Sequence, residues 1–286
     1  MDIILKSLNE DLLSLYNEDY IESARILNKN LGFNFISENC KPMYFTGKFD
    51  AKTVFLMLNP GANAGNYSFK NSEKNSYENF NDFFQKQLNH YINYGIEDSG
   101  RIDNFDLKQA AFLFGFKDSG IDIPDFVKEK NKEIMLKAKE NVLMQKLQLE
   151  LVPYLSVEFL NIFDNKKLAL QNIVFFTNYI DRIFDAIVFH KRKYVIFGAK
   201  QFYYMFQALQ ELGYCKVEFG IEQGYKIDGL QKKVYFNTVK ILHKGNQING
   251  GIAYSFPRRD LPNAYPKMRK YGELCYQEML RVFNNK

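Results

Sequence analysis

Residues 53–69 read TVFLMLNPGANAGNYSF, and the change of character within this stretch decides the fold. Residues 53–58 form a short continuous apolar run, which is typical of a strand in the interior of a sheet. Asn59, Pro60 and Gly61 then end the run, because proline lacks an amide donor and glycine permits tight turning. In a parallel sheet a ligand binds beyond such a strand end, so these residues are the first candidates for a site.

Strand and helix patterns alternate along the rest of the chain. Further strands are expected at 146–152, 193–198 and 234–243, with a hairpin across 214–233. Helical periodicity is found at 1–30, 76–94, 124–144, 178–189 and 199–212. Strands separated by helices of this length imply right-handed crossovers. We therefore expect an α/β fold, a three-layer α/β/α sandwich with a central, mostly parallel sheet of four to five strands and an N-terminal helical extension.

The chain reads as a single domain. It has 286 residues, with no internal repeat, low-complexity tract or linker-like segment that would mark a boundary. We expect a helical extension over residues 1–50, a core over 51–260 and a C-terminal helix over 261–286.

Composition narrows the classes of partner and cofactor. The net charge of +5 and the pI of about 8.8 are compatible with a polyanionic partner without requiring one. Cys40, Cys215 and Cys275 are widely separated, which argues against a disulfide framework and a zinc site and favours a reducing cytoplasm. No apolar run approaches the roughly 20 residues needed to span a bilayer. We expect no metal, no cofactor and no membrane partner.

Four strand ends, taken in order, resemble the uracil-DNA glycosylase superfamily. FLMLNPG, ending at Gly61, looks like the first motif in the form found in the single-strand-selective and mismatch-specific branches. LELVPY, ending at Tyr154, is similar to the second strand and its hydrophobic-Pro-aromatic turn. YVIFGAKQF at 194–202 looks like the third strand, and VKILHKGNQ at 239–247 lies where the family places its histidine. The resemblance covers roughly residues 50–260.

The resemblance implies hydrolysis of an N-glycosidic bond after a base is flipped out of the stack. Asn59 would hold the attacking water, and His243 would stabilise the charge on the departing base, so these two are the expected catalytic residues. An aromatic side chain shortly after the first motif would stack on the base. The residues expected to bind the base are Pro60, Gly61, Tyr67, Phe69 and Glu150.

Glu150 departs from the family pattern. Many members read uracil with an asparagine near the end of the second strand, because an amide both donates and accepts. An ionised carboxylate only accepts, so Glu150 suits an amino or ring N–H donor, as on cytosine or a modified base. Alternatively, Glu150 points to the other face of the strand and pairs with a lysine, since a register slip of one residue reverses the face.

The segment after His243 combines features that base extrusion requires. Residues 246–270 contain a glycine pair, basic residues and apolar side chains such as Ile248 and Ile252 that would serve as a wedge. The residues expected to bind DNA are Lys244, Asn246, Arg258, Arg259, Lys267 and Arg269. The alternative is a solvated basic surface loop.

The expected function is therefore a monofunctional glycosylase that removes uracil or a related damaged or modified base from single- or double-stranded DNA. One alternative is a catalytically weak or silent member that binds nucleic acid or a modified base, in defence or sensing. A second is an enzyme that acts on free nucleotides or nucleosides. Each residue also has a plain structural interpretation: Asn59 to Gly61 form a common turn motif, and His243 can be a hydrogen-bonded histidine of the fold.

Overall fold

The structure is a computed structural model that describes most of the chain. The described residues are 19–32, 36, 45–48, 51–58, 89, 92, 104–117, 131–154, 156, 159–189, 192, 194–254 and 265–284. The strands are β1 (Phe45–Gly47), β2 (Thr53–Met57), β3 (Leu147–Glu150), β4 (Tyr194–Phe197), β5 (Lys216–Phe219), β6 (Gln223–Tyr225), β7 (Val234–His243) and β8 (Asn246–Ala253). The α-helices are α2 (Asp19–Leu31), α5 (Asn104–Gly115), α6 (Lys132–Leu143), α7 (Lys166–Asn172), α8 (Thr177–Phe189), α9 (Gln201–Glu211) and α10 (Tyr265–Phe283), with 3₁₀ turns η2 (Phe159–Phe163) and η3 (Ile173–Phe176).

The fold is α/β, as expected, but its sheet is larger and more mixed than the sequence suggested. The sheet has eight strands in the order β1-β3-β2-β4-β8-β7-β5, and β6 also pairs with β7. Four neighbours, β3, β2, β4 and β8, are mutually parallel. β1 is antiparallel to β3, and β5, β6 and β8 are antiparallel to β7. The prediction of a mostly parallel sheet of four to five strands is therefore correct only for this parallel centre.

A two-residue hairpin accounts for the largest difference. β7 and β8 are joined by Lys244 and Gly245, whose φ angles are +48° and +78°, and His243 pairs directly with Asn246 across the turn. Two consecutive residues with positive φ are the signature of a type I′ turn, whose twist matches that of the flanking strands. The chain therefore reverses at Lys244, and β7 runs against the four parallel strands.

Residues 214–233 do not form the predicted hairpin. β5 pairs with the last part of β7, where Lys216 faces Leu242, and β6 pairs with its first part, where Tyr225 faces Val234. Both short strands thus lie along the same edge of β7, because β8 occupies its other edge. The long β7 is the template for both strands.

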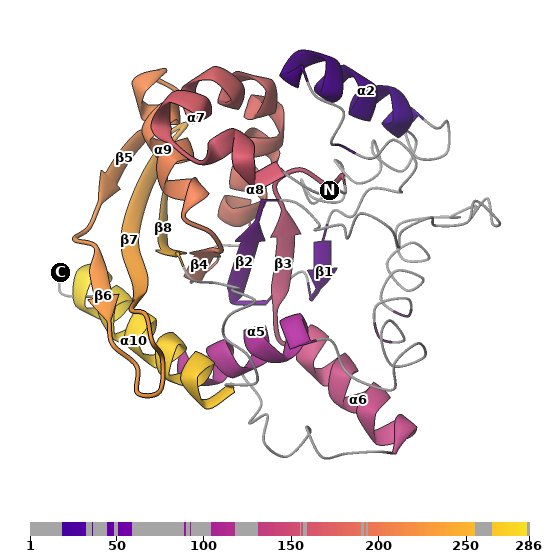
Figure 1. Cartoon of the computed structure of the whole chain (residues 1–286), viewed down its shortest axis with the longest axis vertical. Helices are drawn as coiled ribbons and strands as arrows, with labels where there is room; N and C mark the ends of the chain where they lie inside the picture. Colours follow the sequence, from indigo (N-terminus) through magenta and orange to yellow (C-terminus); the bar gives the residue numbers. More distant parts are fainter. Residues whose placement is uncertain are drawn as a thin grey trace.

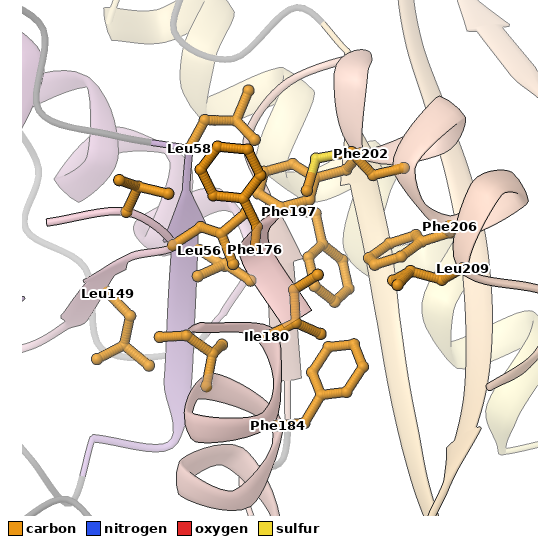
Figure 2. Close-up of a cluster of buried hydrophobic side chains, with 14 of the residues drawn as sticks. Leu56, Leu58, Leu149, Phe176, Ile180, Phe184, Phe197, Phe202, Phe206 and Leu209 are labelled. Atoms are coloured by element: carbon orange, nitrogen blue, oxygen red, sulfur yellow. The ribbon is translucent and has the colours of Figure 1, made fainter. Parts of the chain in front are cut away.

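Helices cover both faces of the sheet (Figure 1). In β2, Val54 and Leu56 belong to a core that contains residues of α7, α8 and α9, whereas Phe55 packs in a second core with residues of α5, α6 and α10. This alternation follows from the two-residue period of a strand. Figure 2 shows the first core, in which aromatic and aliphatic side chains from η3, α8 and α9 cover the strand side chains.

Glycines in β8 make room for two core phenylalanines. A Cβ on Gly250 would lie 2.6 Å from Cε2 of Phe197, and a Cβ on Gly251 would lie 2.0 Å from Cζ of Phe236. The first part of the segment expected to extrude a base, residues 246–253, is therefore a strand of the core. Ile248 and Ile252 are 3% and 0% exposed, so the prediction that they act as an exposed wedge is wrong.

The other expected helices are found where the structure describes the chain. The periodicity at 178–189 and 199–212 corresponds to α8 and α9, the C-terminal helix to α10, and the extension to α2. The aromatic stretch at 76–94 lies almost wholly outside the described residues. Among the described helices, none combines the length and the apolar character needed to cross a membrane.

Candidate functional site at the carboxyl edge of the parallel strands

The four parallel strands end at a common level. Glu150 of β3 pairs with Met57 of β2, and in the rows before them Leu56 pairs with both Leu149 and Phe197. Phe197 of β4 pairs in turn with Ile252 of β8. The next residue along each strand thus lies at one edge of the sheet, which we call the carboxyl edge.

The connections from this edge leave in opposite directions. The chain returns from β2 to β3 through α5 and α6, which cover one face. It returns from β3 to β4 through α7 and α8, which cover the other face, and thereby passes over β2. A crevice forms where successive connections diverge in this way, and ligands of open α/β sheets bind there. The carboxyl edge beside β2 and β3 is the topologically expected site.

A buried polar row leads to this edge along β3. Lys146, Gln148 and Glu150 alternate with leucines, so they share the face that packs on α5. Lys146 Nζ lies 2.9 Å from Asp106 Oδ1 and also donates to Gln109 Oε1. The row connects a buried ammonium near the start of β3 to a carboxyl group at its end.

Glu150 is the last member of the row and is only partly bonded. Gln148 Nε2 donates to Glu150 Oε1 at 2.5 Å, and Glu150 Oε2 is buried with no hydrogen-bond partner among the described residues. Burial raises the pKa of Glu150 to about 8, although the hydrogen bond from Gln148 and the charge of Lys146 both lower it. A buried carboxyl group with an unpaired oxygen is costly to the fold, and such groups gather at functional sites.

The sequence left two alternatives for Glu150, a contact with the base or a pairing with a lysine, and the structure has features of both. The side chain turns to the α5 face, and no direct ion pair joins it to Lys146 within the described residues. The link runs through Gln148, to which Lys146 donates directly at 3.5 Å and also through Gln109. The residue is also placed at the carboxyl edge, as the resemblance implied. Because the raised pKa favours the protonated form at neutral pH, the assumption of an ionised carboxylate is not supported.

His243 lies at the opposite edge of the sheet. It pairs with Asn246 at the start of β8, whereas the carboxyl edge coincides with Ala253 at the end of β8. Seven residue steps at about 3.3 Å each separate these ends by roughly 23 Å. The expectation that His243 follows the fourth strand end beside those of β2 and β3 is wrong, because β7 runs antiparallel to the four parallel strands.

The environment of His243 is that of a bonded structural residue. Its Nε2 lies 2.7 Å from Asp181 Oδ1, and its Nδ1 lies 3.3 Å from the carbonyl oxygen of Tyr214. Its ring stacks on Tyr214 at 5.1 Å and meets Phe184 edge-on at 5.3 Å. Burial raises the pKa of Asp181, but hydrogen bonding to Tyr214, Lys244 and His243 outweighs it, so this pKa is lowered. Both ring nitrogens thus lie within hydrogen-bonding distance of an oxygen atom.

The described residues among those expected to bind DNA lie at separate places in the fold. Lys244 and Asn246 lie in the hairpin beside His243, and Lys244 Nζ is 3.0 Å from Asp181 Oδ1. Lys267 donates to the carbonyl oxygen of Gly229 in the β6–β7 loop, which lies beyond the end of β8, at the carboxyl edge. Arg269 lies over the ring of Phe114, 4.5 Å from its centroid, and Arg258 and Arg259 are outside the described residues.

The pairing of β2 with β3 continues up to the residue that precedes Asn59. Leu58 is described and accepts a hydrogen bond from Val152 N at 3.0 Å, which continues the β2–β3 pairing past the strand ends. The expected site residues that lie outside the described part of the chain are Asn59, Pro60 and Gly61 of the first motif, and Tyr67 and Phe69 after it.

Sequence reasoning missed the partners of Glu150. The signal is present in the sequence as KLQLEL at 146–151, where polar and apolar residues alternate strictly. Such alternation predicts one apolar and one polar face. Asp106 and Gln109 occupy positions i and i+3 of α5 and so share one face of that helix. Neither pattern alone tells which polar faces meet.

Comparisons with protein-family models, with curated proteins and with solved structures found no match to this chain. The site must therefore be interpreted from its own residues. Among the described residues there is no cluster of three or more His, Cys, Asp or Glu side chains that could hold a metal ion.

Proposed function

We propose that this protein binds a nucleobase of DNA at the carboxyl edge and hydrolyses its N-glycosidic bond. The observation that carries the proposal is the buried, half-bonded carboxyl group of Glu150 at the end of β3. A group of this kind, with a pKa near the operating pH, is suited to give a proton to a leaving group. The resemblance of the first three strand ends to the uracil-DNA glycosylase superfamily supplies the class of substrate.

The topology supports the same location. Three segments chosen for this resemblance are β2, β3 and β4, and they are parallel neighbours in the order β3-β2-β4. The fourth parallel strand is β8, so the fourth strand end of the site is Tyr254 and not His243. In this proposal Glu150 replaces His243 as the group that assists departure of the base.

A second candidate is a protein that binds a modified base without cleaving it. The observation that favours it is the position of His243, which removes from the site the only histidine that the resemblance offered as a catalytic group. A buried carboxyl group can recognise a base through hydrogen bonds as well as protonate it.

One experiment separates these functions. The protein is incubated with oligonucleotides that carry uracil, hypoxanthine, xanthine or 5-substituted pyrimidines, and alkali then reveals abasic sites. An unmodified oligonucleotide of the same sequence is the control, and fluorescence anisotropy measures binding in parallel. Cleavage of one modified strand supports the glycosylase, and selective binding without cleavage supports the base-binding protein. The proposal is contradicted if the protein neither binds nor cleaves any oligonucleotide of the panel.

A further inference from the structure

A chain of three hydrogen bonds joins a buried ammonium to Glu150. Lys146 Nζ donates to Gln109 Oε1, Gln109 Nε2 donates to Gln148 Oε1 at 2.8 Å, and Gln148 Nε2 donates to Glu150 Oε1 at 2.5 Å. Lys146 and Gln109 are 0% exposed, Gln148 is 7% and Glu150 is 4%. Water has little access to any link of this chain.

The lysine fixes the direction of every link. An ammonium group has only donors, so Gln109 must turn its oxygen toward Lys146 and its amide nitrogen toward Gln148. Gln148 must then accept with its oxygen and donate with its nitrogen. Glu150 Oε1 is therefore an acceptor. A proton on this carboxyl group belongs on Oε2, the oxygen that has no hydrogen-bond partner in the part of the chain that the structure describes.

We propose that Lys146, Gln109 and Gln148 orient Glu150 as a neutral carboxylic acid that donates from Oε2 to an acceptor atom of the bound base. The inference rests on the proposed function and deepens it. The substrate class is a base that presents a carbonyl oxygen or an unprotonated ring nitrogen to Glu150, and an amino group at that position is rejected. Glu150 is the catalytic residue, and the other three are positioning residues.

The groups around the polar row keep the pKa of Glu150 close to neutral pH. Burial favours the neutral form of Glu150, while Gln148 and Lys146 favour the charged form, and together they leave its pKa at about 8. Lys146 is itself paired with Asp106, which also lies 3.8 Å from Lys139. An acid with a pKa close to neutrality is protonated and still able to release its proton.

The chemical step balances with water as the only co-reactant. As the bond between the anomeric carbon and the base nitrogen breaks, its electron pair stays with the base, which takes the proton from Oε2. Water adds to the anomeric carbon as hydroxide, and its remaining proton restores the Glu150 acid. The products are the free base and an abasic sugar.

The test follows the Glu150 carboxyl carbon by ¹³C NMR in glutamate-labelled protein without ligand, with Glu150→Gln to assign the signal. In the wild-type protein this carbon should titrate far above ordinary glutamates, with a midpoint near 8. Lys146→Met should move the midpoint upward by about one pH unit, because a nearby opposite charge is lost. Gln148→Met should also move it upward, which provides a second variant if the first does not fold.

The matched control is Lys139→Met, which removes the other buried lysine beside Asp106 but no link of the chain. It should leave the midpoint of Glu150 unchanged. A Glu150 signal that is already ionised at pH 6 overturns the inference, whatever the base-release result. An equal shift in Lys139→Met and Lys146→Met overturns the role of the chain. A titration as expected, in a protein that binds and cleaves no base, contradicts the proposed function alone.

Discussion

The two edges of the sheet each hold a buried titratable side chain, and the two are bonded in opposite ways. At the carboxyl edge, Glu150 has one bonded oxygen and one oxygen that no described residue contacts with a hydrogen bond. At the opposite edge, both ring nitrogens of His243 face acceptors, on Asp181 and on Tyr214. Burial costs free energy at both positions, but only at His243 do the partners offset it.

We interpret this contrast as the difference between a group that serves a ligand and a group that serves the fold. A residue that serves the fold is fully bonded without a ligand, whereas a residue that serves a ligand keeps part of its bonding capacity open. We therefore assign function to Glu150 and stability to His243. The predictions below test this division, beginning with the largest expected effect.

Exchange of one side chain at each edge should separate catalysis from folding. Glu150→Gln keeps the shape and the donor of the neutral acid but cannot give up a proton, so base release should fall by about 100-fold or more while binding persists. His243→Gln is the matched control and should retain release. Single-turnover rates on the cleaved oligonucleotide measure both. An equal loss of base release in the two variants would contradict the assignment of function to Glu150 and stability to His243.

The pH dependence of stability should differ between wild type and Glu150→Gln. The pKa of Glu150 is raised from 4.5 to about 8, so the folded state holds a proton that the unfolded state releases. The contribution of Glu150 is fully present below pH 4.5 and is lost as the pH rises toward 8, by up to about 1.4 kcal/mol per pH unit. Urea unfolding of both proteins at several pH values measures this contribution to the free energy of unfolding. Parallel curves for the two proteins would contradict the raised pKa.

His243→Ala should lower the free energy of unfolding by about 1–3 kcal/mol, because it leaves part of a buried hydrogen-bonded cluster unpaired. The pKa of Asp181 is lowered, so its contribution is present above the ordinary aspartate pKa and is lost as the pH falls through the folded value. Asp181→Asn should therefore flatten the acid limb of the stability curve. Thermal unfolding of both variants, with Lys244→Ala beside them, supplies the measurement.

Two lysines at opposite edges should differ in the smallest of these effects. Lys267 lies at the carboxyl edge and Lys244 at the His243 edge. If DNA lies along the carboxyl edge, Lys267→Ala should reduce the slope of log affinity against log salt by about 0.9 or less, and Lys244→Ala should leave it unchanged. Anisotropy titrations over a range of salt give the slopes. The reverse pattern would place the DNA at the other edge.

Three of the four parallel strands could be predicted because they are short segments with clear ends. β2 and β4 are continuous apolar runs, β3 alternates polar and apolar residues, and each sequence prediction lies within a residue or two of the observed strand. The β7–β8 hairpin could not be predicted with the same ease, because its turn is Lys244-Gly245 and lysine is not a residue typical of positive φ. Because this turn was overlooked, β7 was predicted in the wrong direction and His243 was expected at the carboxyl edge instead of the opposite edge.

The candidate site could be predicted only in part, because local sequence gives the position of Glu150 but not its hydrogen bonds. Glu150 was singled out as a base-binding residue because the resemblance places such a residue near the end of the second strand, and its position at that end depends only on β2 and β3. Its bonding depends on Gln109, which is 39 residues away from Gln148 and reaches it only when α5 packs on the sheet. Contacts between distant segments leave no mark in local periodicity, so the polar row had to be found in the structure.

Hydrogen–deuterium exchange with a uracil-bearing single-stranded oligonucleotide tests most directly which edge of the sheet is functional. Binding should slow exchange at the ends of the parallel strands, in Leu151 to Tyr154 and at Gly198, and leave the Lys244 turn unchanged. An oligonucleotide of the same sequence with thymine in place of uracil gives the control. Protection confined to the Lys244 turn and Asp181, or absent from both edges, would contradict the assignment of function to the carboxyl edge.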